Sequence, residues 1–136
     1  MASPVKRSEK LKRLVAVQRH LEKMAEHELA ATTRHRAEVN QSMEEVIEAI
    51  GSVNPIHRQF AYQYSERFSR LTVKEKQLAG VQQIQEMKVM RERTKGDRLQ
   101  DNMKEAREHE DREAADNAIY ELIDMTMSLQ AIEPKD

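Results

Sequence analysis

Cysteine is absent from this chain of 136 residues, which excludes disulfide bonds and thiolate metal sites. Glycine and proline number three each, tryptophan is missing, and aromatic residues make up only 4%. With 38% hydrophobic and 35% charged residues, the chain has little material for a globular core. Its abundance of Glu, Lys, Arg, Ala, Gln, Met and Leu favours long helices, and recurrent apolar spacing argues against disorder.

Long hydrophobic runs are also missing. The longest early run is Leu14–Val17, far short of the roughly 18 apolar residues that cross a bilayer. The basic residues near the start are not followed by the apolar core of a secretory signal. We therefore expect no transmembrane segment and a cytoplasmic location.

The charges are grouped in blocks along the chain, although the net charge is only −1. Residues 1–23 sum to +5, residues 24–50 to −4, residues 51–100 to +5 and residues 101–136 to −7. Blocks of like charge are typical of association surfaces or of solvated helix faces.

A spacing of three and four residues predicts a coiled-coil seam in the first third of the chain. The predicted seam consists of Leu11, Leu14, Gln18, Leu21, Ala25, Leu29, Thr32, Arg36, Val39, Met43, Val46 and Ile50. The two four-residue steps from Leu21 to Leu29 predict a stutter that locally unwinds the supercoil.

The segment Gly51–Pro55 predicts a turn, because Gly51 suits the left-handed position after a helix, Asn54 an N-cap and Pro55 the first helical position. So short a connection requires antiparallel neighbours. We therefore expect an all-α fold, an antiparallel two-helix coiled-coil hairpin forming one domain over residues 1–136. Helix one is expected at about 8–50, the turn at 51–55 and helix two, the longer, at about 56–131.

Folding the chain about residue 53 places residue i beside residue 106 − i, so that helix one, which begins at Ser8, pairs as far as about residue 98. Near that limit, helix two either continues through Gly96 or breaks there and folds back, and the sequence leaves both outcomes open. Gly80 would face Glu26, where it either permits close helix approach or is a tolerated surface glycine.

Beyond an acidic stretch, apolar residues return at helical spacing and predict a surface for a second copy or a partner. These candidate residues are Ile119, Leu122, Ile123 and Leu129.

Catalytic patterns are missing from the chain. There is no Gly-rich phosphate loop, nucleophile elbow or His-Glu-x-x-His motif, and no Glu-x-x-His pair of a di-iron bundle. The best metal argument, His20 and His27 with Met24 between them, is outweighed by the ordinary role of solvated histidines. We expect no enzymatic activity, no cofactor and no metal.

Four of the five aromatic residues lie within nine positions after the turn. Positions 60, 64 and 68 share a helix face and position 62 points away from it, so part of this surface is expected to be exposed. Such a cluster either binds a partner or caps the end of a coiled coil. The candidate partner-binding residues at the tip are Met43, Ile47, Phe60, Tyr62, Tyr64 and Phe68.

Two basic runs are expected to meet at the other end of the hairpin. The candidate residues of this basic end are Lys6, Arg7, Lys10, Arg13, Arg91, Arg93 and Lys95. A solvated end and an acidic protein partner are both open interpretations. Nucleic acid is disfavoured, because no aromatic residues are interleaved with the basic ones and the chain is slightly acidic overall.

The opening pattern resembles that of the flagellar type III export stalk proteins, the FliJ family. It is carried by Leu11, Leu14, Leu21, Glu22, Ala25, Glu28, Leu29 and Ala30, a Leu-x-x-Leu start followed by a Glu/Ala-rich helix. Members of that family are small cytosolic antiparallel coiled coils with a longer second helix.

The resemblance implies a non-catalytic stalk or chaperone component that inserts into the export ATPase ring and contacts the export gate, peripheral to the inner membrane. It also implies gate contacts near the tip, where Met43, Ile47, Phe60, Tyr64 and Leu71 lie. The alternative is a structural or scaffold coiled coil that self-associates as a homo-oligomer.

Overall fold

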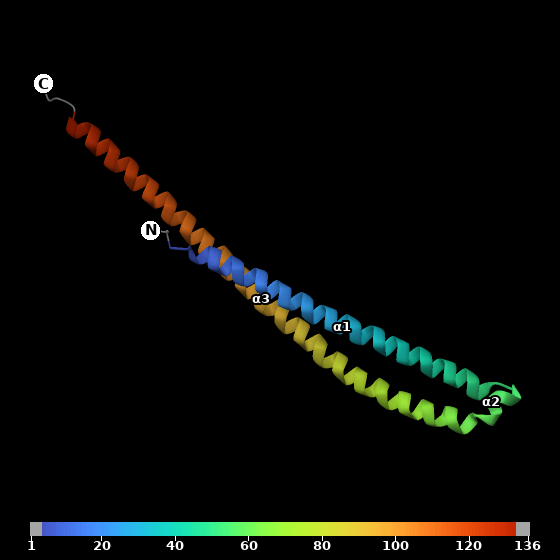
Figure 1. The fold of residues 1–136 in the computed structure, drawn as a ribbon. Coiled ribbons are helices and arrows are strands. Elements are labelled where there is room, and N and C mark those ends of the chain that lie inside the picture. Colours follow the sequence, from blue (N-terminus) through green and yellow to red (C-terminus); the bar gives the residue numbers. More distant parts are fainter. Residues whose placement is uncertain (1–3, 133–136) are drawn as a thin grey trace. The chain divides into compact units, whose positions relative to one another are not determined.

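The computed structural model describes residues 4–132, and these form helices with no strand among them. Helix α1 covers Arg7–Gly51, the short helix α2 covers Pro55–Gln59 and helix α3 covers Ala61–Ile132 (Figure 1). The predicted all-α hairpin with a longer second helix is thus confirmed. Helix α3 passes through Gly96 without a break, which decides between the two outcomes that the sequence left open.

The connection between the long helices is built as its sequence predicts, with one exception. Asn54 caps α2 by accepting a hydrogen bond from the backbone N–H of Ile56 at 3.1 Å, and Pro55 occupies the start of α2. The chain then bends at Phe60 before α3 begins. Gly51 does not adopt the predicted left-handed conformation; it is the last residue of α1, and no described glycine has a positive φ.

By its internal contacts the chain divides into two units, which are described separately. The hairpin unit is Gln18–Lys95, and the terminal unit combines the residues up to Val17 with those from Gly96 onward. Each unit contains a part of α1 and a part of α3.

In the hairpin unit, the positions removed from solvent include a series spaced alternately by three and four residues on each long helix. On α1 these are Gln18, Glu22, Ala25, Leu29, Thr32, Arg36, Val39, Met43 and Val46. On α3 they are Tyr64, Phe68, Leu71, Glu75, Leu78, Gln82, Gln85, Val89 and Glu92. This is the regular spacing of a coiled-coil seam.

The observed seam corrects the predicted one at its N-terminal end. Leu14 and Leu21 lie outside the seam with 52% and 43% of their surface exposed, whereas Val15 and Glu22 take the inward positions. The predicted stutter is therefore wrong. A strict three-four alternation keeps one face of α1 toward α3, and that geometry outweighs the greater hydrophobicity of the two leucines.

The seam of the hairpin unit contains polar pairs as well as apolar contacts. The guanidinium of Arg36 binds the carboxylate of Glu75 at 2.6 Å and donates to the amide oxygen of Gln82 at 3.2 Å. Only a few apolar side chains are buried, among them Val39, Val46 and Val89. Polar seam residues of this kind specify the register at some expense of stability.

In the terminal unit, the first turns of α1 lie along α3 as far as Glu110. Ser8 is buried, and both its backbone N–H and its hydroxyl donate to the Glu110 carboxylate, the backbone contact measuring 3.1 Å. Gly96 and Ala106 are the buried positions on α3 in this unit.

The predicted register is wrong, because Gln18 meets Glu92 and Ser8 meets Glu110, where residues 88 and 98 were expected. Helix α2 and the bend at Phe60 add residues to the connection and move the centre of the hairpin toward residue 56. Pairing therefore continues well beyond residue 98.

Gly80 is exposed, and a Cβ built on it would meet nothing within 4 Å, so the alternative of close helix approach there is wrong.

Candidate interaction site

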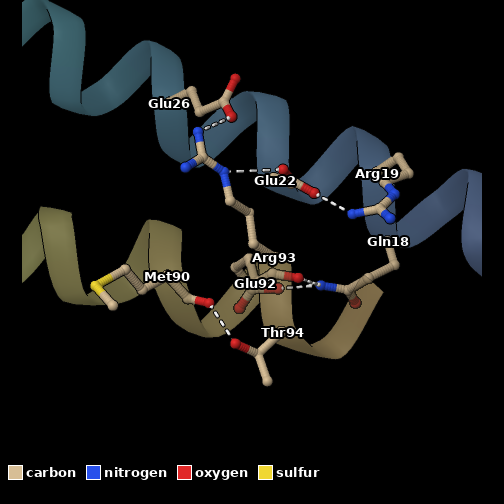
Figure 2. Close-up of polar contacts among 8 residues, drawn as sticks. All are labelled: Gln18, Arg19, Glu22, Glu26, Met90, Glu92, Arg93 and Thr94. Atoms are coloured by element: carbon tan, nitrogen blue, oxygen red, sulfur yellow. Dashed lines mark hydrogen bonds and ion pairs between the residues drawn. The ribbon is translucent and has the colours of Figure 1, made fainter. Parts of the chain in front are cut away.

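A polar network joins α1 and α3 in the hairpin unit, and Figure 2 shows Arg93 reaching across from α3 between two glutamates of α1. Its guanidinium lies 3.0 Å from a carboxylate oxygen of Glu26 and 3.2 Å from one of Glu22. The second oxygen of Glu22 binds Arg19 at 2.9 Å. The hydrogen bond and charge of Glu26, followed by those of Glu22, raise the pKa of Arg93.

Beside this network, Gln18 points from α1 toward Glu92 of α3 (Figure 2). The Gln18 amide donates both to the Glu92 carboxylate and, at 3.1 Å, to the Glu92 backbone carbonyl. The hydrogen bond from Gln18, supported by nearby Lys95, lowers the pKa of the Glu92 carboxyl. These contacts hold the two helices in one register.

The residues of the predicted basic end are divided between the two units. Lys6, Arg7, Lys10 and Arg13 belong to the terminal unit, whereas Arg91, Arg93 and Lys95 belong to the hairpin unit. In the hairpin unit Arg93 pairs with glutamates of α1, and the Lys95 ammonium lies 3.4 Å from the Glu92 carboxylate. The expected joint surface depended on the register that the structure corrects.

An open groove of about 900 Å³ follows the hairpin unit next to the Arg93 network. Apolar parts of Leu29 and Ala30 from α1 and of Val89 and Met90 from α3 line it, and charged residues including Arg34 lie at its edges. Sequence reasoning missed this groove, because it depends on which residues of the two helices face each other.

The tip residues fall into two groups. Ile47, Phe60 and Tyr62 are exposed, with Tyr62 retaining 71% of its surface. The remaining three candidates, Met43, Tyr64 and Phe68, are half-buried in the seam. The Tyr64 ring packs edge-on against the His57 ring of α2, with 6.0 Å between the ring centroids.

Three further apolar residues are exposed at the tip and were not among the candidates. They are Ile50, Val53 and Ile56, with 46%, 81% and 63% of their surface exposed. We call Ile50, Val53, Ile56, Phe60 and Tyr62 the tip cluster. Ile50 was predicted to be the last residue of the seam, and its exposure corrects that prediction, because the series of inward positions on α1 ends at Val46. The sequence signal was present for Val53, because an apolar residue is unusual in a turn that otherwise consists of Gly, Ser, Asn and Pro.

The four C-terminal candidates lie on an exposed segment of α3 in the terminal unit. Every residue from 111 to 132 is exposed, and we call this segment the overhang. Ile119, Leu122, Ile123 and Leu129 keep between 47% and 68% of their surface. Figure 1 shows the overhang as the part of α3 that continues beyond the first residue of α1.

Residues 4–132 contain no group of three or more His, Asp or Glu side chains placed to hold a metal ion. None of the helices in that range combines the length and the apolar character that a membrane span requires. By its fold the protein belongs to the class of all-α helical hairpins. No protein-family model, curated protein or solved structure matches the chain.

Proposed function

We propose that this chain is a non-catalytic interaction protein that binds a larger protein assembly through the tip cluster. The carrying observation is the exposure of five apolar residues between positions 50 and 62, around the connection between α1 and α3. Tyr62 projects from the first turn of α3, and Val53 lies in the connection between α1 and α2.

The tip cluster has the composition of a binding surface. Aromatic and large aliphatic residues are enriched at the centres of protein interfaces, where their burial stabilises the complex. Val53 and Tyr62 have most of their surface exposed and contribute little to the hairpin itself. Their burial against a partner would remove that apolar surface from water at about 25 cal/mol per Å².

The resemblance to the flagellar export stalk family supplies the candidate assembly. In that role the chain is a stalk or chaperone component of protein export, and its partners are the export ATPase ring and the export gate. The polar seam supports a mechanical role, because pairs such as Arg36 with Glu75 keep the two helices in register. A tip that contacts the gate agrees with the position of the tip cluster.

The experiment uses the purified full chain, the export ATPase and the cytoplasmic part of the export gate from the same cell. Stimulation of ATP hydrolysis and binding to the gate are measured for the wild type, Val53→Asp and Tyr62→Ala. We expect both variants to bind the gate at least about tenfold more weakly, as loss of a contact worth 1.4 kcal/mol would produce.

The matched control is Lys76→Ala, which removes an exposed side chain of α3 away from the tip. This variant should behave as the wild type. Absence of any effect of the wild-type protein on either export component would refute the export role. Equal binding by the wild type and both tip variants would refute the tip cluster as the contact.

A further inference from the structure

The overhang carries an apolar series of its own, spaced alternately by three and four residues. It consists of Ala115, Ala118, Leu122, Met125, Leu129 and Ile132. All six residues are exposed, and Leu122 and Ile132 keep 68% and 77% of their surface. A series with this spacing is typical of a helix that packs along another helix.

This apolar series is out of phase with the face of α3 that packs on α1. Continued beyond Glu110, the three-four alternation of that face would pass through Glu113, Asn117, Tyr120 and Asp124, of which only Tyr120 has a large apolar surface. At 3.6 residues per turn, the apolar series is rotated from it by roughly a third of a turn. The overhang therefore presents its apolar face to a surface other than a continuation of the α1 seam.

The net charge of the overhang indicates which surface it would pack on. Between residues 111 and 132 there are five acidic residues and one basic residue, a net charge of −4. The first turns of α1, residues 6–17, contain five basic residues and Glu9, a net charge of +4, and we call them the basic start.

The basic start also has exposed apolar residues with the same spacing. Leu14 and Val17 keep 52% and 59% of their surface, and with Lys10 they share one face of α1. A basic helix with exposed apolar residues complements an acidic helix that carries an apolar stripe.

The first turn of the overhang meets the basic start of its own chain, where Glu113 and Arg7 line one pocket. The apolar series begins further along α3, at Ala115. Ser8, near the first residue of α1, already binds Glu110, and α3 continues from there as an unbroken helix beyond the point where α1 begins. We infer that the overhang of one copy packs on the basic start of α1 in a second copy, and that the contact is reciprocal. This self-association goes beyond the proposed function, which concerns the tip.

Two charge-reversal variants of the full chain test the contact. Lys10→Glu with Arg13→Glu changes the basic start, and Asp111→Lys with Glu121→Lys changes the two acidic residues that lie in line with the apolar series or directly beside it. Sedimentation equilibrium of each variant alone should show self-association weakened about tenfold or more, because like charges then face each other. In an equimolar mixture the two variants should associate as strongly as the wild type, since each overhang then meets an opposite charge.

The matched control is Asp116→Lys with Asp124→Lys, which makes the same change in net charge on the other face of the overhang. Alone it should self-associate nearly as the wild type does, and mixed with the basic-start variant it should not restore association. Restoration by this control would show that net charge alone drives the mixture, which would overturn the inference.

Two other results would also overturn it. Unchanged association of the basic-start variant would indicate that overhangs pair with each other. A wild-type protein that stays monomeric at every concentration and at low salt would indicate that only a different protein covers the overhang. Circular dichroism of each variant checks that the helix content is retained, so that a loss of association is not a loss of folding.

Discussion

At the scale of single residues, polar side chains in the seam are the main feature of this hairpin. Arg36, Gln18 and Ser8 each lie at a seam position and each finds a specific partner on α3. If α1 slid along α3 by one heptad, these polar groups would lose their partners. They would then be removed from water without a compensating hydrogen bond. The register is therefore determined more by polar pairing than by the small apolar core.

The exposed glycine in the middle of α3 leads to a stability prediction. Gly80→Ala should raise the free energy of unfolding by about 0.5–1 kcal/mol, because alanine reduces the conformational freedom of the unfolded chain and favours helix. A Cβ at this position meets nothing within 4 Å, so no strain opposes the gain. Urea denaturation followed by circular dichroism measures the change, and a destabilised variant would contradict an open site at residue 80.

Glu110 leads to a prediction about pH. Hydrogen bonds from the Ser8 hydroxyl and backbone lower the pKa of the Glu110 carboxyl below its ordinary value of 4.5. A lowered folded-state pKa contributes stability that is fully present above the ordinary value and is lost as the pH falls through the lowered one. Glu110→Gln should therefore have a lower unfolding midpoint than the wild type at neutral pH.

The difference between these two midpoints should shrink as the pH falls below 4.5, because the wild-type carboxyl then becomes protonated. Thermal unfolding at a series of pH values measures it. Glu108→Gln is a suitable control, since Glu108 is exposed on the same turn of α3. If the difference in unfolding midpoint between the wild type and Glu110→Gln stayed constant down to strongly acidic pH, the Ser8 contacts would not depend on the charge of Glu110.

At the scale of elements, the turn separates residues that support the fold from residues that are free to bind. Tyr62 is exposed, whereas Phe68, two turns further along α3, lies half-buried in the seam. The sequence grouped both as tip candidates, because aromatic type and proximity in the chain do not reveal which side of α3 faces α1.

The two aromatic residues should therefore respond differently to truncation. Tyr62→Ala should change the free energy of unfolding by no more than about 0.5 kcal/mol, as is usual for surface positions. Phe68→Ala should cost roughly 2 kcal/mol, less than the 3–5 kcal/mol of a fully buried phenylalanine. Chemical denaturation of both variants gives the comparison, and equal losses would contradict the observed orientation of the first turns of α3.

At the scale of the whole molecule, the overhang is the part of the described chain that contributes least to folding of a single copy. All of its residues are exposed, so its helix gains little tertiary packing within one chain. As an extension of α3 it avoids the cost of helix nucleation, yet a helix of this length is only marginally stable without packing.

A truncation ending at Glu110 should consequently keep the unfolding midpoint of the dilute full-length protein to within about 2–4 °C, the effect of roughly 1 kcal/mol or less. The helical circular dichroism signal of the truncated protein should fall by no more than the fraction of the chain that the truncation removes. Thermal unfolding at low protein concentration provides the measurement. A large drop in the midpoint would show that residues after 110 stabilise the hairpin within one chain.

Sequence by itself determined the all-α hairpin, because helix-forming residues dominate and one short segment with Asn54 and Pro55 interrupts them. The apolar character of the overhang was also readable, since it depends on spacing within one helix. Only the tertiary structure decided the register, the inward position of Glu22 instead of Leu21, the continuity of α3 at Gly96 and the exposed side of the tip. These features depend on how two helices pair across a polar seam, where the pairing of side chains from distant positions outweighs the hydrophobicity of any single residue.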